Sequence, residues 1–335
     1  MTTTFVEARS VGQHLNWEKL ASLPDAEGFA GSFAGASHGA LIVAGGSNFP
    51  DKRPWEGGTK VWYDQIFVLE KPDGKWQRGF KLPFPLGYGV SINCAEGLLC
   101  IGGSSAQQHH DEVVLISYDK GQVTTKFFPK LPSPCANMCG ALIGDTVFVA
   151  GGILNPDSTN ALKSLWSLDL NQTNKGWGEL PPCPGPGRML AAAGVEGESF
   201  IFAGGAGLAA GPHGKPVREW LRDAWKYTPG KGWKQIADLP HPSVAAPSPM
   251  PNVGGCLLLG GDDGAQLTAT PTAHRGFPRG VLRYDAKNNQ WEKFGAMPFG
   301  LVTTTMALWD GKFIVAGGEQ KPGVRSPDIW AGSLP

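Results

Sequence analysis

The residues best suited to chemistry lie in one short loop near the end of the chain, GGEQKPGVR, residues 317–325. Glu319 directly follows a glycine pair, and Pro322 and Gly323 favour a turn that would bring Arg325 back toward it. A carboxylate is ionised at neutral pH and can accept a proton, while the planar fork of arginine suits a substrate carboxylate. We therefore interpret Glu319 as a general base and Arg325 as a substrate clamp. On pattern alone the alternative has somewhat more weight, namely a carboxylate that caps its own turn and a solvated arginine.

Three further residues are weaker candidates for substrate binding. Arg188 begins a strand in the segment GRMLAAAG, near the place where we expect a channel to open. Asn48 follows another glycine pair by two residues, and Tyr88 opens the strand segment YGVSIN. Arginines in long loops are ordinarily solvated, and we expect this of Arg53, Arg218, Arg275 and Arg279.

Two pairs of adjacent residues resemble other kinds of site. Asp262 and Asp263 follow a glycine pair and could be taken for glycosidase carboxylates or calcium ligands. Adjacent residues of an extended segment point to opposite sides, so we do not expect them to face each other as an acid pair. His109 and His110 have no third metal ligand near them in sequence, so we interpret them as exposed loop histidines.

The elements that must position these residues form a repeat. Apolar runs end in a pair of glycines six times, at intervals of 49 to 57 residues, and the second glycines are Gly46, Gly103, Gly152, Gly205, Gly261 and Gly318. Each unit has a Gly- and Ala-rich strand, the apolar run, a third strand and a fourth that usually opens on tryptophan. We predict an all-β fold, a six-bladed kelch-type β-propeller with four antiparallel strands per blade. It forms a single domain over residues 1–335, with residues 1–14 as a flexible N-terminal extension.

The two ends of the chain complement each other. The segment LNWEKLASLP, with Trp17, is a fourth strand without its first three, and the C-terminal DIWAGSLP is a third strand without its fourth. We therefore predict that the N-terminal strand closes the ring by joining the C-terminal blade. In a four-stranded meander the loops after the second and fourth strands leave on one side. The long loops 47–64, 206–222 and 262–280 gather there, which indicates a ligand mouth.

Composition excludes several classes of partner. Lysine plus arginine and aspartate plus glutamate number 29 each, so no net positive field attracts nucleic acid or anionic membranes. No apolar run is long enough to cross a bilayer. The chain has six cysteines, which we expect to be free thiols, and we expect neither a metal nor a cofactor. The first residues lack the apolar core of a secretion signal, so we expect a cytoplasmic protein, or a periplasmic or secreted one if a signal was cut away.

Three segments carry a resemblance to a known family: the GGEQKPGVR loop, GFAGSFAGASHGALIVAGGSNF from Gly28, and YGVSINCAEGLLCIGG from Tyr88. They resemble the kelch-type sialic acid mutarotases, also called N-acetylneuraminate epimerases. The likeness extends over nearly the whole chain, and the GGEQKPGVR loop is its most specific part. In the best-known bacterial members the blade with this loop is central, whereas here it is last, so the chain looks like a cyclically permuted branch.

This resemblance implies an isomerase that interconverts the α and β anomers of N-acetylneuraminate through the open-chain keto form. It implies that Glu319 is the proton acceptor and that Arg325 belongs to the same pocket. Members of the family also tend to have an arginine in the blade that contains Arg188. The partner is then a small sugar acid. The group that protonates the ring oxygen stays open between protonated Glu319, Tyr88 and water.

Other classes of propeller protein make different predictions. A non-catalytic kelch interaction or carbohydrate-binding module is the main alternative, and an interaction module would expose a broad apolar surface with Glu319 pointing to water. A sialidase would need an arginine triad with a tyrosine nucleophile and usually repeats an Asp-box, which we do not find. A copper oxidase would need copper-ligating histidines and a tyrosine paired with cysteine.

Overall fold

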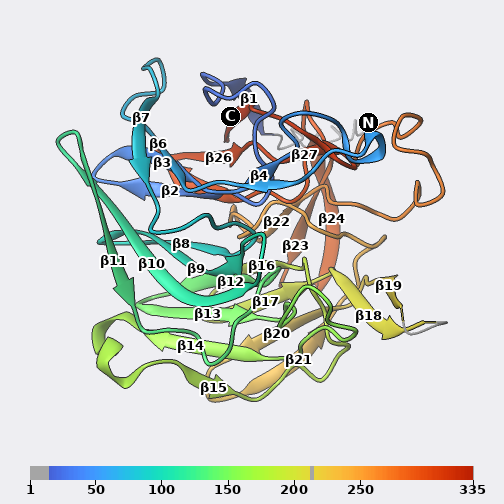
Figure 1. The fold of residues 1–335 in the computed structure, drawn as a ribbon. Helices are drawn as coiled ribbons and strands as arrows, with labels where there is room; N and C mark the ends of the chain where they lie inside the picture. Colours follow the sequence, from blue (N-terminus) through green and yellow to red (C-terminus); the bar gives the residue numbers. More distant parts are fainter. Residues whose placement is uncertain (1–14, 212–214, 335) are drawn as a thin grey trace, which may run out of the picture.

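The computed structural model describes residues 15–211 and 215–334, which form a six-bladed β-propeller (Figure 1). The predicted all-β propeller is confirmed. The N-terminal extension predicted for residues 1–14 lies outside the described residues. Within the described residues, helical structure is limited to two short 3₁₀ segments, η1 (Pro54–Glu56) and η2 (Leu170–Lys175), and no helix is long and apolar enough to cross a membrane.

Blades 1 to 4 each contain a four-stranded antiparallel sheet. Their strands in chain order are β2 (Phe33–Ser37), β3 (Ala40–Ala44), β6 (Gln65–Leu69) and β7 (Gln77–Lys81); β8 (Val90–Cys94), β9 (Gly97–Ser104), β10 (His109–Asp119) and β11 (Gln122–Phe128); β12 (Cys139–Ile143), β13 (Thr146–Ala150), β14 (Leu165–Asp169) and β15 (Gly178–Leu180); β16 (Ala192–Glu196), β17 (Ser199–Ala203), β20 (Ala224–Thr228) and β21 (Gly232–Ile236). The second strands are buried on both faces, as in ALIVA of β3, because each blade packs between two neighbours.

Blade 5 has three regular strands, β22 (Leu257–Leu259), β23 (Gly280–Asp285) and β24 (Gln290–Ala296). The segment in the place of its first strand makes only isolated bridges, from Ser248 to Thr305 and from Asn252 to Cys256. Pro249 and Pro251 lie in this segment. Proline has no backbone N–H to donate, which explains why the pairing is interrupted here.

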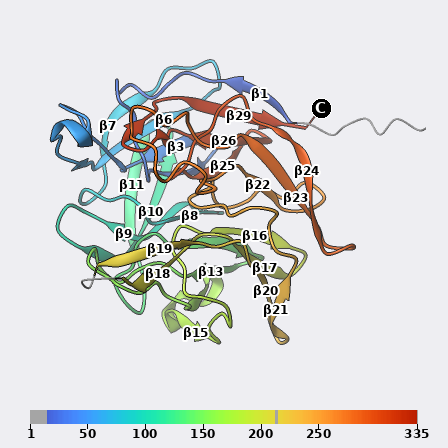
Figure 2. The same cartoon turned by 90° about the vertical axis from the view of Figure 1, so that its right-hand side faces the viewer.

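Blade 6 closes the ring with strands from both ends of the chain. It contains β25 (Met306–Trp309), β26 (Lys312–Ala316), β29 (Ile329–Ser333) and β1 (Asn16–Lys19). Strand β1 pairs with β29 from Asn16 opposite Ser333 to Lys19 opposite Trp330, and the two strands lie side by side in Figure 2. The predicted closure by the N-terminal strand is confirmed, so this blade has no open edge where the chain ends meet.

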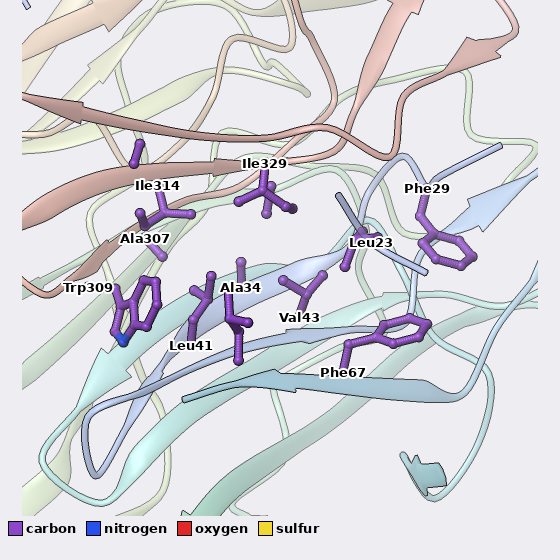
Figure 3. Close-up of a cluster of buried hydrophobic side chains, with 13 residues drawn as sticks. Leu23, Phe29, Ala34, Leu41, Val43, Phe67, Ala307, Trp309, Ile314 and Ile329 are labelled. Carbon is purple, nitrogen blue, oxygen red and sulfur yellow. The ribbon is translucent and has the colours of Figure 1, made fainter. Parts of the chain in front are cut away.

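Apolar side chains fill the seam between the first and last blades (Figure 3). Leu41 and Val43 of β3 face Ile314 of β26 and Ile329 of β29, and all four side chains are fully buried. Trp309 donates a hydrogen bond from Nε1 to the carbonyl oxygen of Gly39 at 2.7 Å across the same seam.

The fourth-strand tryptophans join neighbouring blades, as the repeat predicted. Each indole Nε1 donates to a backbone carbonyl that follows the outer strand of the preceding blade, and the distances lie between 2.7 and 2.9 Å. The pairs are Trp76 with Ala21, Trp177 with Pro129, Trp233 with Pro181 and Trp291 with Ala237. Their role is therefore structural.

A closed ring of six backbone hydrogen bonds encircles the central channel. Each blade contributes one residue just before its first strand, and each N–H donates to the carbonyl of the previous member at 2.7 to 2.8 Å. The members are Gly31, Tyr88, Asn137, Leu190, Ala245 and Thr303, all in the left-handed region with φ between 53° and 69°. That conformation is costly for residues other than glycine, and the hydrogen bonds offset the cost. The ring fixes the floor of the mouth.

Candidate functional site

The loop that follows the last glycine pair forms a small hairpin of β27 (Glu319–Lys321) and β28 (Val324–Arg325). Glu319 pairs with Arg325 in register, and Arg325 Nη1 donates to Glu319 Oε1 at 2.6 Å. The backbone N–H of Gly323 donates to the same oxygen at 2.7 Å. The predicted turn and the predicted proximity of acid and arginine are both confirmed.

Neighbouring blades hold this hairpin in place. Backbone hydrogen bonds join Glu319 and Val302 in both directions, at 2.8 and 3.0 Å. The guanidinium of Arg325 lies 4.7 Å from the ring centroid of Phe49, and its Nε lies 3.5 Å from the carbonyl oxygen of Ser47. The Arg325 side chain is 5% exposed and that of Glu319 is 19% exposed. Blade 1 therefore completes a site that begins on blade 6.

Both side chains line a cavity of about 640 Å³ at the mouth of the channel. This volume falls in the usual range for small-molecule sites, about 300–1,000 Å³. Members of the hydrogen-bonded ring, including Tyr88, Asn137 and Leu190, form its floor. The same ring residues also line a narrow cavity of about 60 Å³ inside the channel. The mouth is thus a bounded site above a tight channel.

The charge of the mouth cavity is positive. Lys60, Arg218 and Arg325 line it, and Glu319 is the one carboxylate among its described lining residues. Arg218 lies on β19 (Pro216–Trp220), which pairs with β18 (Ala206–Ala210) in a hairpin that projects from the propeller (Figure 1). Arg218 is exposed, as expected of a loop arginine, and it also lines the cavity. A cavity with this balance favours an anionic ligand.

Tyr88, predicted as a candidate, also lines the cavity. Its hydroxyl lies 2.7 Å from Ser47 Oγ, and either atom can donate the proton. A phenol has a single proton, so Tyr88 can donate it to a bound ligand when it accepts a hydrogen bond from Ser47.

His109 and His110 are buried in β10, so the expectation of exposed loop histidines is wrong. His109 lines the mouth cavity, and its Nδ1 donates to the carbonyl oxygen of Ile153 at 3.0 Å. Burial lowers the pKa of His109 below its ordinary value of 6.5. The neutral ring therefore carries its proton on Nδ1, and Nε2 remains an acceptor. His110 instead stacks on Phe84, with ring centroids 4.8 Å apart.

Arg188 does not reach the mouth cavity. Its side chain is 0% exposed and pairs with Asp223, while its other donors contact the carbonyl oxygens of Pro186, Gly204 and Asp223. Its guanidinium lies 5.0 Å from the ring centroid of Phe202. The expectation that Arg188 faces the channel mouth is wrong, because its side chain is buried among these partners inside the propeller.

Asn48 is also buried, at 1% exposure, and does not line the cavity. Its Nδ2 donates to the carbonyl oxygen of Gly28 at 3.0 Å and lies 3.3 Å from Asp25 Oδ1. Its Oδ1 accepts from the Tyr63 hydroxyl at 2.8 Å. Asn48 therefore holds loops together and is not available for substrate.

The other pairs singled out in the sequence have structural roles. Asp262 Oδ1 accepts from the N–H of Gly264 at 3.0 Å, and Asp263 Oδ1 accepts from that of Ala265 at 2.9 Å. Each aspartate thus caps a turn, as expected for residues that do not face each other. The six cysteines are free thiols, and five of them are buried.

Comparison with known proteins found one enzyme family that part of the chain resembles. A sequence model of the family "N-acetylneuraminate epimerase" matches residues 1–125. The N-acetylneuraminate epimerase of Salmonella enteritidis PT4 is 39% identical over 108 residues, and that of Yersinia pestis (strain Pestoides F) is 38% identical over 111 residues. The chain resembles N-acetylneuraminate epimerases. The match covers 28% of this chain in both cases, and 28% and 27% of the lengths of the two relatives.

The fold has a solved counterpart over almost its whole length. The solved structure of YjhT superposes with a TM-score of 0.66 and covers 94% of this chain and 99% of that chain, at 16% sequence identity. At this identity the likeness establishes the propeller fold alone. The cyclic permutation of the blades stays a prediction.

Lys60, Trp62 and His109 are among the lining residues that sequence reasoning did not propose for the site. A signal for the first two was present. Lys60 and Trp62 are two residues apart at the end of the long loop 47–64, and in an extended segment such residues lie on one side. Strand β5 (Val61–Trp62) pairs with β4 (Ser47–Asn48) and provides that extended geometry.

Proposed function

We propose that this protein is a cofactor-free mutarotase that interconverts the α and β anomers of N-acetylneuraminate through the open-chain form. The observation that carries the proposal is a carboxylate with one uncommitted oxygen in a positively charged cavity. Glu319 Oε1 accepts from both Arg325 and Gly323, whereas Oε2 has no hydrogen bond to any of the described residues. The resemblance to N-acetylneuraminate epimerases points to the same reaction.

Glu319 is the proposed general base. Two donors on Oε1 fix the orientation of its carboxylate, so Oε2 can accept the proton of the anomeric hydroxyl. As this proton leaves, the bond between the anomeric carbon and the ring oxygen breaks, a ketone forms, and the ring oxygen gains a proton. Rotation about the adjacent carbon–carbon bond followed by the reverse steps yields the other anomer. Overall, no proton or electron is gained or lost.

Arg325 has two proposed roles. Its Nη1 holds Glu319, and its Nη2, which has no hydrogen bond to the described residues, is available to a substrate oxygen. The proton for the ring oxygen comes from protonated Glu319, from the Tyr88 hydroxyl or from water, and all three are compatible with the cavity.

The proposal is tested by following freshly released α-N-acetylneuraminate by proton NMR. We expect the wild type to accelerate its equilibration with the β anomer, and Glu319→Gln to lower kcat by about 10²–10⁴-fold, the usual range for loss of a general base. Glu292→Gln is a matched control, because Glu292 also pairs with an arginine, Arg283, but does not line the cavity. Absence of acceleration by the wild type contradicts the reaction, and full activity of Glu319→Gln contradicts only the choice of base.

A carbohydrate-binding module is the second candidate. Trp62 and Tyr88 present aromatic rings in the mouth cavity, a feature that sugar-binding sites share whether or not they are catalytic. In that case the wild type would bind the sugar acid without changing its rate of anomerisation. The NMR experiment separates the two candidates directly.

A further inference from the structure

We propose that Lys60, held between Trp62 and Tyr88, is the positive group that binds the substrate carboxylate, so that recognition of an anionic sugar depends on Lys60 more than on Arg325. This inference rests on the proposed function, because it assigns the carboxylate subsite of the same cavity.

The ammonium group of Lys60 lies against two aromatic rings. Its Nζ is 4.0 Å from the ring centroid of Tyr88 and 4.4 Å from that of Trp62. The two rings meet edge to face, with centroids 6.4 Å apart and planes inclined by 62°. Contacts of this kind hold a cation over the ring faces. Lys60 Nζ has no hydrogen bond to the described residues, so the N–H groups that do not point at the rings remain available to a ligand.

Each ring is itself fixed by a hydrogen bond. Trp62 Nε1 donates to Ser104 Oγ at 3.2 Å, and the Tyr88 hydroxyl lies 2.7 Å from Ser47 Oγ. Ser47 also pairs with Trp62 through strands β4 and β5. The lysine is therefore ordered before a ligand arrives, which reduces the entropy lost on binding.

The charge of Lys60 is not neutralised within the protein. None of the carboxylates in residues 15–211 and 215–334 forms an ion pair with Lys60 or with Arg218. Arg325 differs, because Glu319 already balances its charge at 2.6 Å. An incoming carboxylate gains more from a cation without a counter-ion than from one that is already paired. Lys60 is thus the better partner for the carboxylate, and Arg218 adds to the attraction.

This arrangement separates two tasks within one cavity. Lys60 and its two rings lie on blade 1 and on the floor, whereas the Glu319–Arg325 pair lies on blade 6. The carboxylate of this sugar acid is bonded directly to the anomeric carbon, so the inference requires that one substrate reach Lys60 with its carboxylate and Glu319 with its anomeric hydroxyl across the same cavity. Because the carboxylate is unchanged in the reaction, the contact stabilises ground state and transition state alike and acts on KM rather than kcat.

The test compares an acid with its neutral ester. Calorimetric titration of the wild type and of Lys60→Gln with N-acetylneuraminate and with its methyl ester measures the charge-dependent part of binding. We expect Lys60→Gln to weaken binding of the acid by roughly 10- to 100-fold, the range for a hydrogen bond to a charged group, and to leave binding of the ester almost unchanged. In the NMR assay we expect KM to rise by the same factor while kcat changes little. Lys60→Arg keeps the charge and should recover most of the affinity.

Lys126→Gln is the matched control. Lys126 also lies over an aromatic ring, 5.3 Å from the centroid of Phe128, but it does not line the cavity, so its loss should leave both ligands unaffected. Unchanged acid binding in Lys60→Gln, or equal weakening of acid and ester, overturns the inference. Loss of acid binding in a protein whose wild type does not accelerate anomerisation supports the Lys60 subsite and contradicts the mutarotase. A wild type that does not bind the acid overturns both.

Discussion

Arg188 and Arg325 are buried arginines with similar surroundings, but they differ in how many of their hydrogen-bond donors are used within the protein. Each pairs with a carboxylate, and each places its guanidinium near an aromatic ring, that of Phe202 or Phe49. Arg188 donates from Nε, Nη1 and Nη2 to protein acceptors, whereas Arg325 lines the cavity and its Nη2 has no hydrogen bond to residues 15–211 and 215–334. Burial and an ion pair alone therefore do not indicate a site.

The carboxylates differ in the same way. Asp223 Oδ2 accepts from Arg188 and from the indole of Trp225 at 2.6 Å, inside the wall between blades. Glu319 concentrates its two internal hydrogen bonds on Oε1 and leaves Oε2 without one among the described residues. Uncommitted hydrogen-bonding capacity that faces a cavity is what distinguishes a functional pair from a structural one.

Removal of residues 1–20 should have the largest effect on stability and activity. It should affect the surroundings of Arg325 more than those of Arg188. The truncation deletes β1 and exposes the edge of β29 in the blade that carries Arg325. We expect a lower Tm and loss of activity, with faster hydrogen exchange near Arg325 than near Arg188 in the more distant blades. A truncated protein that stays folded and active would contradict the importance of the seam.

Arg188→Met should reduce stability and spare activity. Removing the arginine leaves Asp223 without its counter-ion, which for buried pairs costs about 3–5 kcal/mol of unfolding free energy. Denaturant unfolding measures this cost, and kcat/KM is measured on the folded fraction. A selective loss of activity at unchanged stability would place Arg188 in the site after all.

Arg325→Met should reduce activity strongly and stability only slightly. Loss of the donor on Glu319 Oε1 and of the free Nη2 should lower kcat by about 100-fold, or about 2.7 kcal/mol. The loss of stability should be smaller than for Arg188→Met, because Arg188 also donates to three backbone carbonyl oxygens, whereas Arg325 has one contact of 3.5 Å to a backbone carbonyl besides its bond to Glu319. Activity equal to that of the wild type would remove Arg325 from the proposed mechanism.

Gly323→Ala tests whether the turn orients Glu319. Gly323 has φ +77°, and an added Cβ would lie 2.7 Å from Cγ of Pro54. A left-handed alanine costs about 1–2 kcal/mol, so we expect the loop to shift and the activity to fall by about tenfold. Gly121→Ala provides a control, since it has a similar φ of +83° with open space around it.

The smallest effect should come from the pH dependence contributed by His109. Burial lowers the pKa of His109, so below pH 6.5 the unfolded chain takes up a proton that the folded chain does not. Stability should therefore fall as the pH decreases below this value, and His109→Gln should remove part of that slope. Thermal unfolding from pH 7 to pH 5 measures the difference, and identical slopes would contradict the burial argument.

Local sequence suggested the Glu319–Arg325 pair, although the pattern alone gave more weight to a carboxylate that caps its own turn, and Glu319 does both. Both residues lie in one hairpin, and Pro322 and Gly323 determine the turn between them, so their proximity does not depend on distant elements. Arg188 could not be placed in this way. Its partner Asp223 is 35 residues away, and only the packing of blade 4 brings the two together.

The cavity walls were equally inaccessible to local reasoning. Lys60 contacts the ring of Tyr88, which comes from the connection into the next blade, and Trp62 reaches Ser104 in that blade. His109 looked like a loop residue because its strand begins immediately after a short connection. Burial of this kind depends on neighbours that are distant in sequence.

The sequence by itself determined the number of blades, the closure of the ring by Trp17 and its strand, and the acid–arginine hairpin, because repeats, complementary ends and turns are local patterns. The tertiary structure decided which charged groups face a common cavity and which are paired with protein partners between the blades. That choice depends on the packing of side chains between blades, where each hydrogen bond made within the protein leaves one fewer for a ligand.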